Sequence, residues 1–375
     1  MNFDFSDEQK QIKDQARKFL NEKCTTKTVR KAYEGAGSFD AALWKQIAEM
    51  GWMGTAIPEE FGGLGLGYLE LCVVAEELGR ALAPVPFSST LYLFAEALLA
   101  AGSEEQKKRL LPRIAAGEII GTFARSEGPG AVTAKNVRTV FKNGKLSGTK
   151  IAVADGMEAH YAVVLARGSE EAGERGIQLA LVDLNGAGVE RRKTASLDPS
   201  RSHAQIVFDN AGAEALGKIG EGWPSAGRVL DRAAILMAFE QVGGADVCLS
   251  MAKDYAMTRY AFGRPIASFQ AIKHKLADMY VFNELARSNA YYGAWALSTG
   301  ARELPLAAAA ARISATQAFD YAAKENTQTH GGIGFTWEAD CHFYYKRSRH
   351  LGLALGPQRA WKDRLVGELE LSNAA

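Results

Sequence analysis

The C-terminal part of the chain carries three helical segments that are much longer than an average helix. Apolar residues recur with helical spacing over residues 226–259, 266–298 and 305–330. Helices in globular proteins usually span about three or four turns. Longer helices usually pack side by side in a bundle, whose facing surfaces hold cofactors or partner subunits. The sequence therefore predicts a four-helix bundle of long helices at residues 219–375.

Two regions of different pattern precede this bundle. Residues 1–118 show helical spacing, and Ser6 before Asp7 and Glu8 is a typical N-terminal helix cap. Residues 119–218 contain short apolar runs separated by turns, which favours a β-barrel-like domain, with Asn143-Gly144 as a hairpin turn. We therefore expect three domains: an N-terminal α-helical domain (1–118), a middle β domain (119–218) and the helical bundle (219–375).

The overall composition argues against several classes of partner. The 44 Lys and Arg residues nearly balance the 43 Asp and Glu residues, so no strong field favours nucleic acid. The four cysteines are scattered, so we expect a reducing compartment and no metal site. The N-terminus lacks a signal-peptide pattern and no apolar run favours membrane insertion. These observations predict a cytoplasmic protein.

Four motifs occur in a distinctive order. They are PEEFGGLGLG at 58–67, EELGRALAP at 76–84, RYAFGRPIASFQAIKHKLADM at 259–279 and QTHGGIGF at 328–335. In order and spacing they resemble the acyl-CoA dehydrogenase family. The resemblance implies the acyl-CoA dehydrogenase fold and α,β-dehydrogenation of an acyl-CoA thioester. It also implies FAD, electron-transfer flavoprotein as the acceptor, and a homodimer, a homotetramer or a heterotetramer with a homologous subunit.

The resemblance also implies which residues hold FAD. Arg259 would meet the pyrophosphate, because a guanidinium pairs with two phosphate oxygens at once. Phe262 and Gln270 would line the adenine side. Gln328 would approach the dinucleotide together with the backbone of Gly331 and Gly332, where the lack of a side chain permits close contact.

The flavin-covering segment of the family matches residues 126–133, but with departures. Ser126 keeps the hydroxyl that relatives point at the pyrimidine ring. The serine that helps to hold CoA in relatives is Val132 here, and the tryptophan and threonine beside the flavin are Ala152 and Ala154. The loss of an indole leaves a gap unless another group fills it.

The catalytic base of the family is missing at both of its known positions. The family reaction needs a carboxylate to remove the α-proton. Most relatives carry it where this chain has Leu355, which keeps only a backbone N–H, and a minority carry it where this chain has Ala233. Asp231, which matches a substrate-binding aspartate, and Glu240, two helical turns beyond Ala233, are the candidates for a displaced base.

Three functions are compatible with this sequence. The chain is a dehydrogenase with a relocated base, or a base-less subunit that pairs with a catalytic homologue, as in relatives acting on steroid-type CoA thioesters. The third alternative is a flavin oxygenase or oxidase on the same fold, which needs no α-proton base.

Overall fold

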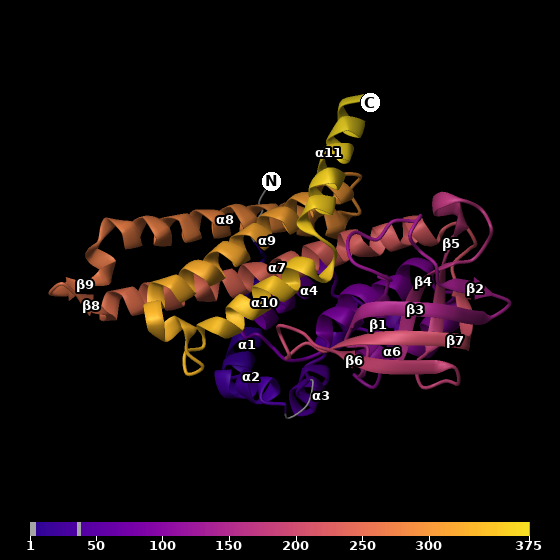
Figure 1. Ribbon diagram of the computed structural model, residues 1–375, viewed down its shortest axis with the longest axis horizontal. Coiled ribbons are helices and arrows are strands. Elements are labelled where there is room, and N and C mark those ends of the chain that lie inside the picture. The colour runs from indigo at the N-terminus through magenta and orange to yellow at the C-terminus, as the bar shows by residue number, and fades with distance from the viewer. Residues whose placement is uncertain (1–4, 36–38, 375) are drawn as a thin grey trace. The chain divides into compact units, whose positions relative to one another are not determined.

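The computed structural model describes residues 5–35 and 39–374, and the chain forms two compact units (Figure 1). The helical unit comprises residues 1–30, 68–83 and 234–375. The barrel unit comprises residues 31–67 and 84–233. The N-terminal helical segment thus contributes to both units instead of forming a compact unit of its own.

The barrel unit contains seven strands and several short helices. The strands are β1 (Gly121–Ala124), β2 (Val140–Lys142), β3 (Lys145–Ala154), β4 (Tyr161–Arg167), β5 (Ile177–Asp183), β6 (Val189–Thr194) and β7 (His203–Leu216). The helices are α3 (Ala41–Glu49), η1 (Trp52–Gly54), η2 (Glu59–Phe61), η3 (Ser88–Ala95), α5 (Glu96–Ala101), α6 (Glu104–Ala115) and η4 (Gly173–Gly176).

Five of these strands close into a barrel. Strand β4 pairs with β5, β5 with β7, β7 with β3 and β3 with β2, and β2 returns to β4 at Val140 and Arg167. Closure removes free strand edges, and side chains fill the interior of so small a barrel. The predicted β-barrel-like domain is therefore confirmed. The predicted hairpin turn is also present, because Asn143 and Gly144 have φ values of 52° and 72°, which a type I′ turn requires.

A buried ion pair ties the end of β1 to β3. The Lys150 ammonium is fully buried and lies 2.6 Å from a carboxylate oxygen of Glu127. The same carboxylate accepts the backbone N–H groups of Arg138 at 2.7 Å and of Thr139 at 3.0 Å. Burial lowers the pKa of Lys150 to about 8, against the stabilising effect of Glu127. This network holds the segment after β1 against the barrel.

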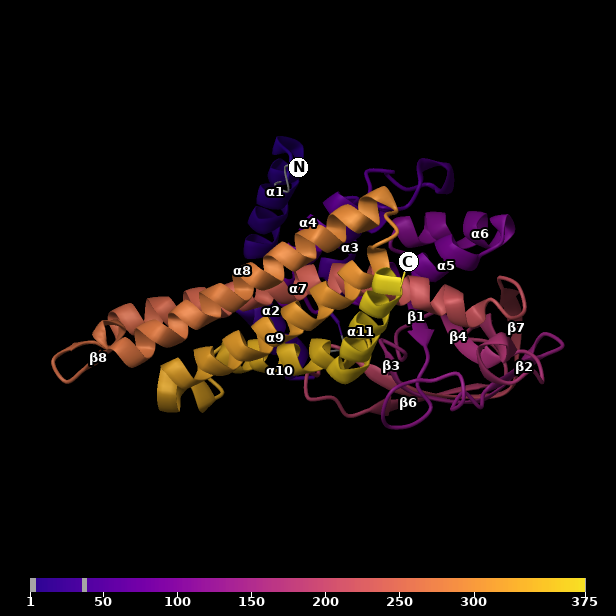
Figure 2. The same cartoon turned by 90° about the horizontal axis from the view of Figure 1, so that it is seen from above.

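The helical unit is built mainly from helices. They are α1 (Asp7–Lys23), α2 (Thr26–Tyr33, which continues into the barrel unit), α4 (Tyr68–Arg80), α7 (Gly222–Thr258, whose first third lies in the barrel unit), α8 (Gln270–Thr299), α9 (Leu304–His330), α10 (Cys341–Ala354) and α11 (Gln358–Ala374). The longest of these are α7, α8 and α9. Short elements connect the helices: β8 (Tyr260–Ala261), β9 (Arg264–Pro265), η5 (Ile266–Ser268) and η6 (Gly331–Phe335). Figures 1 and 2 both show α8 and α9 running side by side, and α9 also packs against α10 and α11.

These elements confirm the predicted bundle of long helices and the cap at Ser6. The Ser6 hydroxyl accepts the N–H of Gln9 at 3.2 Å and the Gln9 side chain accepts the N–H of Ser6 at 2.9 Å, which is a capping box.

Helix α7 is long and apolar enough to cross a membrane by length and composition, yet 72% of its most apolar window is buried inside the protein. Such burial is expected of a core helix.

The EELGR part of the second motif has a structural explanation. Glu76 and Glu77 are only 1% exposed; Glu76 pairs with Lys13 at 2.6 Å and with Arg287 at 2.7 Å, and Glu77 pairs with Arg17 at 2.7 Å. A Cβ atom on Gly79 would lie 1.9 Å from the carbonyl oxygen of Glu240. The motif therefore joins α4 to α1 and α8 by ion pairs and lets α7 approach its backbone directly.

We predict that Lys150→Met lowers the free energy of unfolding by about 3–5 kcal/mol, because it leaves the Glu127 carboxylate without its cation. Chemical denaturation of the variant checks this. Arg192→Gln is the matched control, since Arg192 and its partner Glu190 are 64% and 58% exposed and such pairs contribute little. A loss no larger than that of the control would contradict the role of the ion pair.

The same lysine predicts a pH dependence of stability. Its pKa is about 8 in the folded chain and its ordinary value is 10.5, so between these values the unfolded chain holds more protons. The free energy of unfolding then rises with pH across that window. We expect wild type to gain stability relative to Lys150→Met between pH 8 and about 10.5. Denaturation curves of both proteins across this range measure it, and parallel pH profiles would argue against it.

Candidate cofactor and substrate site

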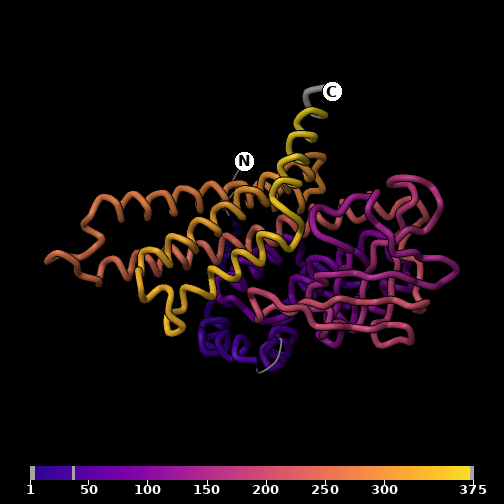
Figure 3. The backbone as a smooth tube through the Cα atoms, viewed as in Figure 1, coloured from indigo at the N-terminus to yellow at the C-terminus, as the bar shows by residue number. Residues whose placement is uncertain are grey.

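The ends of three helices meet at one end of the helical unit. The ring of Tyr255, near the C-terminus of α7, stacks on the ring of His330, the last residue of α9, with centroids 4.2 Å apart. Lys275 in the second turn of α8 pairs with Glu325 of α9 at 2.9 Å. The C-termini of α7 and α9 and the N-terminus of α8 are therefore adjacent, and Figure 3 shows the β8–β9 hairpin protruding from this end.

The β8–β9 hairpin presents a fully exposed aromatic ring. Tyr260 pairs with Pro265 and Ala261 with Arg264, and the Arg259 carbonyl accepts the Ile266 N–H at 2.8 Å. Phe262 at the tip has a φ of 53°, a conformation that a bulky residue rarely adopts, and is 95% exposed. A strained backbone that displays an apolar ring to solvent indicates a ligand or partner at this point.

Arg259 has a free guanidinium next to this hairpin. Its side chain is exposed, and no carboxylate in residues 5–35 or 39–374 lies within 4 Å of it. Gln270, the first residue of α8, is exposed as well. An unpaired arginine at such a place can bind an external anion with both of its N–H edges.

The end of α9 offers an open backbone at the same place. Gly331 has φ 61° and ψ −139°, which favours glycine, and a Cβ atom on either Gly331 or Gly332 would meet nothing within 4 Å. Gln328 in the last turn is exposed. A free guanidinium, an exposed ring and an open glycine backbone fit the phosphates and adenine of a dinucleotide such as FAD. The structure thus brings six of the seven FAD-binding candidates together at this end.

The seventh candidate, Ser126, lies in the barrel unit beside an irregular strand. Its carbonyl accepts the N–H of Ile151 at 2.8 Å. Strand β3 carries a bulge between Lys150 and Val153, where Ala152 is exposed and has a φ of 51°. Ala154 lies opposite His203 of β7, so their side chains share one face of the sheet. Of the positions that depart from the family pattern, Ala152 therefore lies in a β-bulge and Ala154 lies opposite a histidine.

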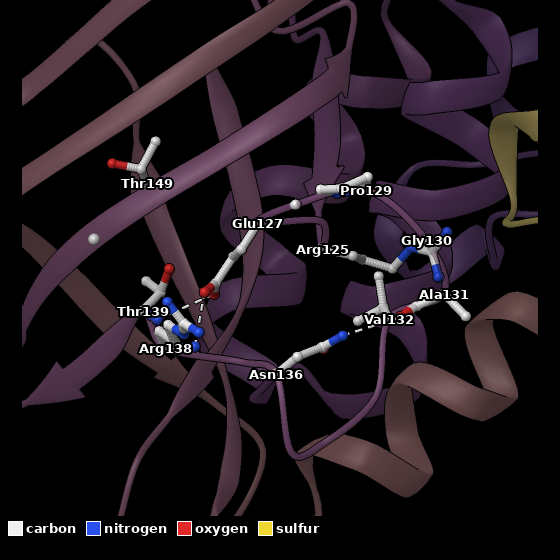
Figure 4. Close-up of a pocket in the computed structure, with 12 residues that line it drawn as sticks. Arg125, Glu127, Pro129, Gly130, Ala131, Val132, Asn136, Arg138, Thr139 and Thr149 are labelled. Carbon is white, nitrogen blue, oxygen red and sulfur yellow. Dashed lines mark hydrogen bonds between the residues drawn. The ribbon is translucent and has the colours of Figure 1, made fainter.

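The segment that matches the flavin-covering motif lines a cavity of about 400 Å³ (Figure 4). The lining residues are Arg125, Glu127, Gly128, Pro129, Gly130, Ala131, Val132, Asn136, Arg138, Thr139, Gly148 and Thr149. Asn136 accepts the Thr133 N–H at 2.9 Å and donates to the Ala131 carbonyl at 3.0 Å, which closes the loop. The cavity therefore has a defined wall.

Arg125 is the functional candidate that the sequence reasoning missed. It directly follows β1, whose four residues are all buried, and burial lowers its pKa to about 10. The signal was present in the sequence, because an arginine at the end of a buried strand is unusual. The match to the family motif begins one residue later, at Ser126.

The candidate base positions contain no exposed carboxylate. Leu355 is 3% exposed, and its carbonyl accepts the indole N–H of Trp361 at 3.2 Å. Ala233 is fully buried on α7, and Asp231 on the same helix is 3% exposed. Glu240 is 1% exposed and lies 3.7 Å from the equally buried guanidinium of Arg347 on α10. Glu240 thus sits in a buried ion pair between α7 and α10.

Comparisons with known proteins agree with this architecture. The sequence model described as "Acyl-CoA dehydrogenase, N-terminal domain" matches residues 6–118, and the one described as "Acyl-CoA dehydrogenase, C-terminal domain" matches residues 220–362. The chain is 33% identical over 342 residues to the acyl-CoA dehydrogenase IpdE2 of Mycobacterium tuberculosis, covering 91% of each chain.

Solved structures show the same likeness. The butyryl-CoA dehydrogenase of Megasphaera elsdenii superimposes with a TM-score of 0.91 at 26% identity, covering 98% of this chain and 100% of that one. A chain of the ChsE4–ChsE5 complex from Mycobacterium tuberculosis superimposes with a TM-score of 0.89 at 27% identity, covering 99% of each chain.

We predict that Arg259→Ala weakens the retention of FAD by about tenfold or more, because it removes a charge-assisted contact to phosphate. The ratio of flavin absorbance to protein absorbance after gel filtration measures this. Lys253→Ala is the control, since Lys253 is an exposed cation on α7, which ends directly before Arg259. Equal flavin content in both variants and wild type would remove Arg259 from the site.

Proposed function

Because the chain belongs to the acyl-CoA dehydrogenase family, we propose that it takes part in the FAD-dependent removal of hydrogen from the α and β carbons of an acyl-CoA thioester. The observation that supports FAD binding is the group of exposed residues at the end of the helical unit. Arg259 would bind the pyrophosphate, Phe262 and Gln270 the adenine side, and Gln328 with Gly331 and Gly332 the dinucleotide backbone. Bound FAD would supply the acceptor for hydride from the β-carbon.

The proton on the α-carbon needs a separate acceptor, and none of the four candidate positions (Ala233, Leu355, Asp231 and Glu240), all within the described residues, offers an accessible carboxylate. At Leu355 an isobutyl group replaces the carboxylate, and at Ala233 a methyl group does so. Glu240 is engaged with Arg347 inside the helical unit, so moving it to a substrate would break a buried ion pair. The described contacts therefore favour a structural role for Glu240 over that of a displaced base.

We further propose that the chain works as a base-less subunit, and that a homologous subunit supplies the carboxylate. This assignment is supported by Leu355 and Ala233, and by the burial of Glu240. A two-component assembly has a parallel in the ChsE4–ChsE5 complex to which the chain is similar. In this assembly the chain contributes its cofactor-binding end, and Asp231 remains the candidate contact to the CoA portion of the substrate.

The remaining partners follow from the same proposal. Electron-transfer flavoprotein is the acceptor that we expect to reoxidise the flavin, and the cytoplasm is the expected compartment. A homodimer or homotetramer is the expected assembly if the chain has its own base, and a heterotetramer if it does not.

An anaerobic visible spectrum of the purified chain separates these alternatives. The chain is measured alone and after addition of straight, branched and steroid-type acyl-CoA thioesters. We expect bound flavin that stays oxidised, or flavin that binds only with a homologous partner present. Bleaching by one thioester with the chain alone would instead show that it has its own base, and rapid reaction of reduced flavin with oxygen would favour an oxygenase or oxidase.

Restoring the missing carboxylate also tests whether the absence of a base limits the activity of the chain. We predict that Leu355→Glu produces flavin bleaching with an acyl-CoA that wild type does not reduce, because it places a base at the family position. Leu353→Glu is the matched control: Leu353 precedes it by two residues and is 70% exposed. If Leu355→Glu folds, retains FAD and bleaches no better than the control, the rest of the pocket is not that of a dehydrogenase.

A further inference from the structure

The cavity of the barrel unit is lined by two arginines that have no ion-pair partner among the described residues. Arg125 and Arg138 both line it, and Figure 4 shows them on opposite sides, with the Arg125 side chain extending toward Gly130 and Ala131. Within residues 5–35 and 39–374, neither guanidinium has a carboxylate within 4 Å. When a guanidinium lines a cavity and has no counter-ion from the protein, we expect that cavity to bind an anion.

The one carboxylate among the lining residues, that of Glu127, already has several hydrogen-bond donors around it. Glu127 accepts hydrogen bonds from the Lys150 ammonium and from the backbone N–H groups of Arg138 and Thr139. Lys150 also donates to the Arg125 carbonyl at 3.2 Å, which fixes the backbone from which the Arg125 side chain extends. Glu127 therefore positions the two arginine-bearing segments, while its charge is compensated by Lys150.

We propose that this cavity is an oxyanion subsite in which Arg125, assisted by Arg138, binds a phosphate or carboxylate group of the acyl-CoA ligand. The assignment of the ligand rests on the proposed function, whereas the oxyanion chemistry rests on the cavity. A volume of about 400 Å³ is large enough for the anion and part of the attached organic group. An anion would also supply the counter-charge that the burial of Arg125 otherwise lacks, consistent with the lowering of its pKa to about 10.

The oxyanion has two sources in an acyl-CoA. One is a phosphate of CoA itself, and the other is a carboxylate on the acyl group. Either anion could come close to the backbone of the loop after Arg125. The space beside Gly128 and Gly130 is open, because a Cβ atom on either glycine would meet nothing within 4 Å. Paired ligands that differ only in the anion therefore distinguish the sources.

Isothermal titration calorimetry of the FAD-loaded full chain provides the test. The probes are CoA against 3′-dephospho-CoA, glutaryl-CoA against pentanoyl-CoA, and inorganic phosphate. The proteins are wild type, Arg125→Gln, Arg125→Lys and Arg138→Gln, with Arg192→Gln as the control. That control loses the same charge from an exposed strand residue of the barrel unit.

We expect Arg125→Gln to weaken binding of the anion-bearing member of one pair by about 10- to 100-fold, as for the loss of a hydrogen bond to a charged group. The binding of the member that lacks this anion changes little, and the control variant binds both members as wild type does. Arg125→Lys keeps the charge but not the planar fork, so it loses less affinity. Arg138→Gln alters only an exposed side chain, so it tests the subsite without disturbing the fold, and we expect a smaller loss in the same pair.

The outcomes separate this proposal from the proposed function. Arg125-dependent binding of inorganic phosphate without binding of any CoA compound would support the subsite and overturn the assignment of an acyl-CoA ligand. Equal affinities of wild type and all the arginine variants for every probe, or no binding of any probe to wild type, would overturn the subsite whether or not the chain reduces its flavin.

Discussion

Two buried arginines hold the helical unit together, and the rest of its architecture depends on them. Arg312 of α9 and Arg347 of α10 are each 1% exposed. Arg312 donates to Gln241 of α7 at 2.8 Å and to the carbonyl of Leu351 of α10, while Arg347 lies 3.7 Å from Glu240 of α7 and donates to the Leu82 carbonyl at 3.3 Å. Because an isolated buried charge is costly, these contacts restrict the register in which α7, α9 and α10 can pack.

This constraint also determines the status of Glu240. By sequence it is an acidic residue two turns from a known base position, which makes it a reasonable catalytic candidate. In the folded unit it is the counter-ion of Arg347 and its backbone lies against Gly79. Moving its carboxylate to a substrate would break this buried pair, and this cost is the reason that we propose a base-less subunit. The packing thereby connects stability of the bundle with the chemistry the chain can perform.

The barrel unit shows how a departure from a family pattern can be more informative than a match. The match at 126–133 pointed to the flavin-covering segment. The adjacent Arg125 belongs to no part of that pattern, yet its guanidinium contributes positive charge to the lining of the cavity. Glu127 and Lys150 form a buried ion pair beside it, whereas the Arg125 guanidinium has no carboxylate within 4 Å in the part of the chain that the structure describes.

The sequence by itself determined the helix-rich N-terminal and C-terminal regions, the strands between them and the family. These predictions depend on local features: helical spacing, the Ser6 cap, the Asn143-Gly144 turn and four ordered motifs. Local features can be recognised from residues that are close together in the sequence. The register of the β7–β3 ladder, the bulge at Ala152 and the division of the N-terminal helices between two units could not be seen there. They depend on pairing between segments far apart in the chain. Only the tertiary structure decided that Glu240 is an ion-pair partner and that Arg125 lines a cavity, because the environment of a charged side chain is set by the elements packed around it.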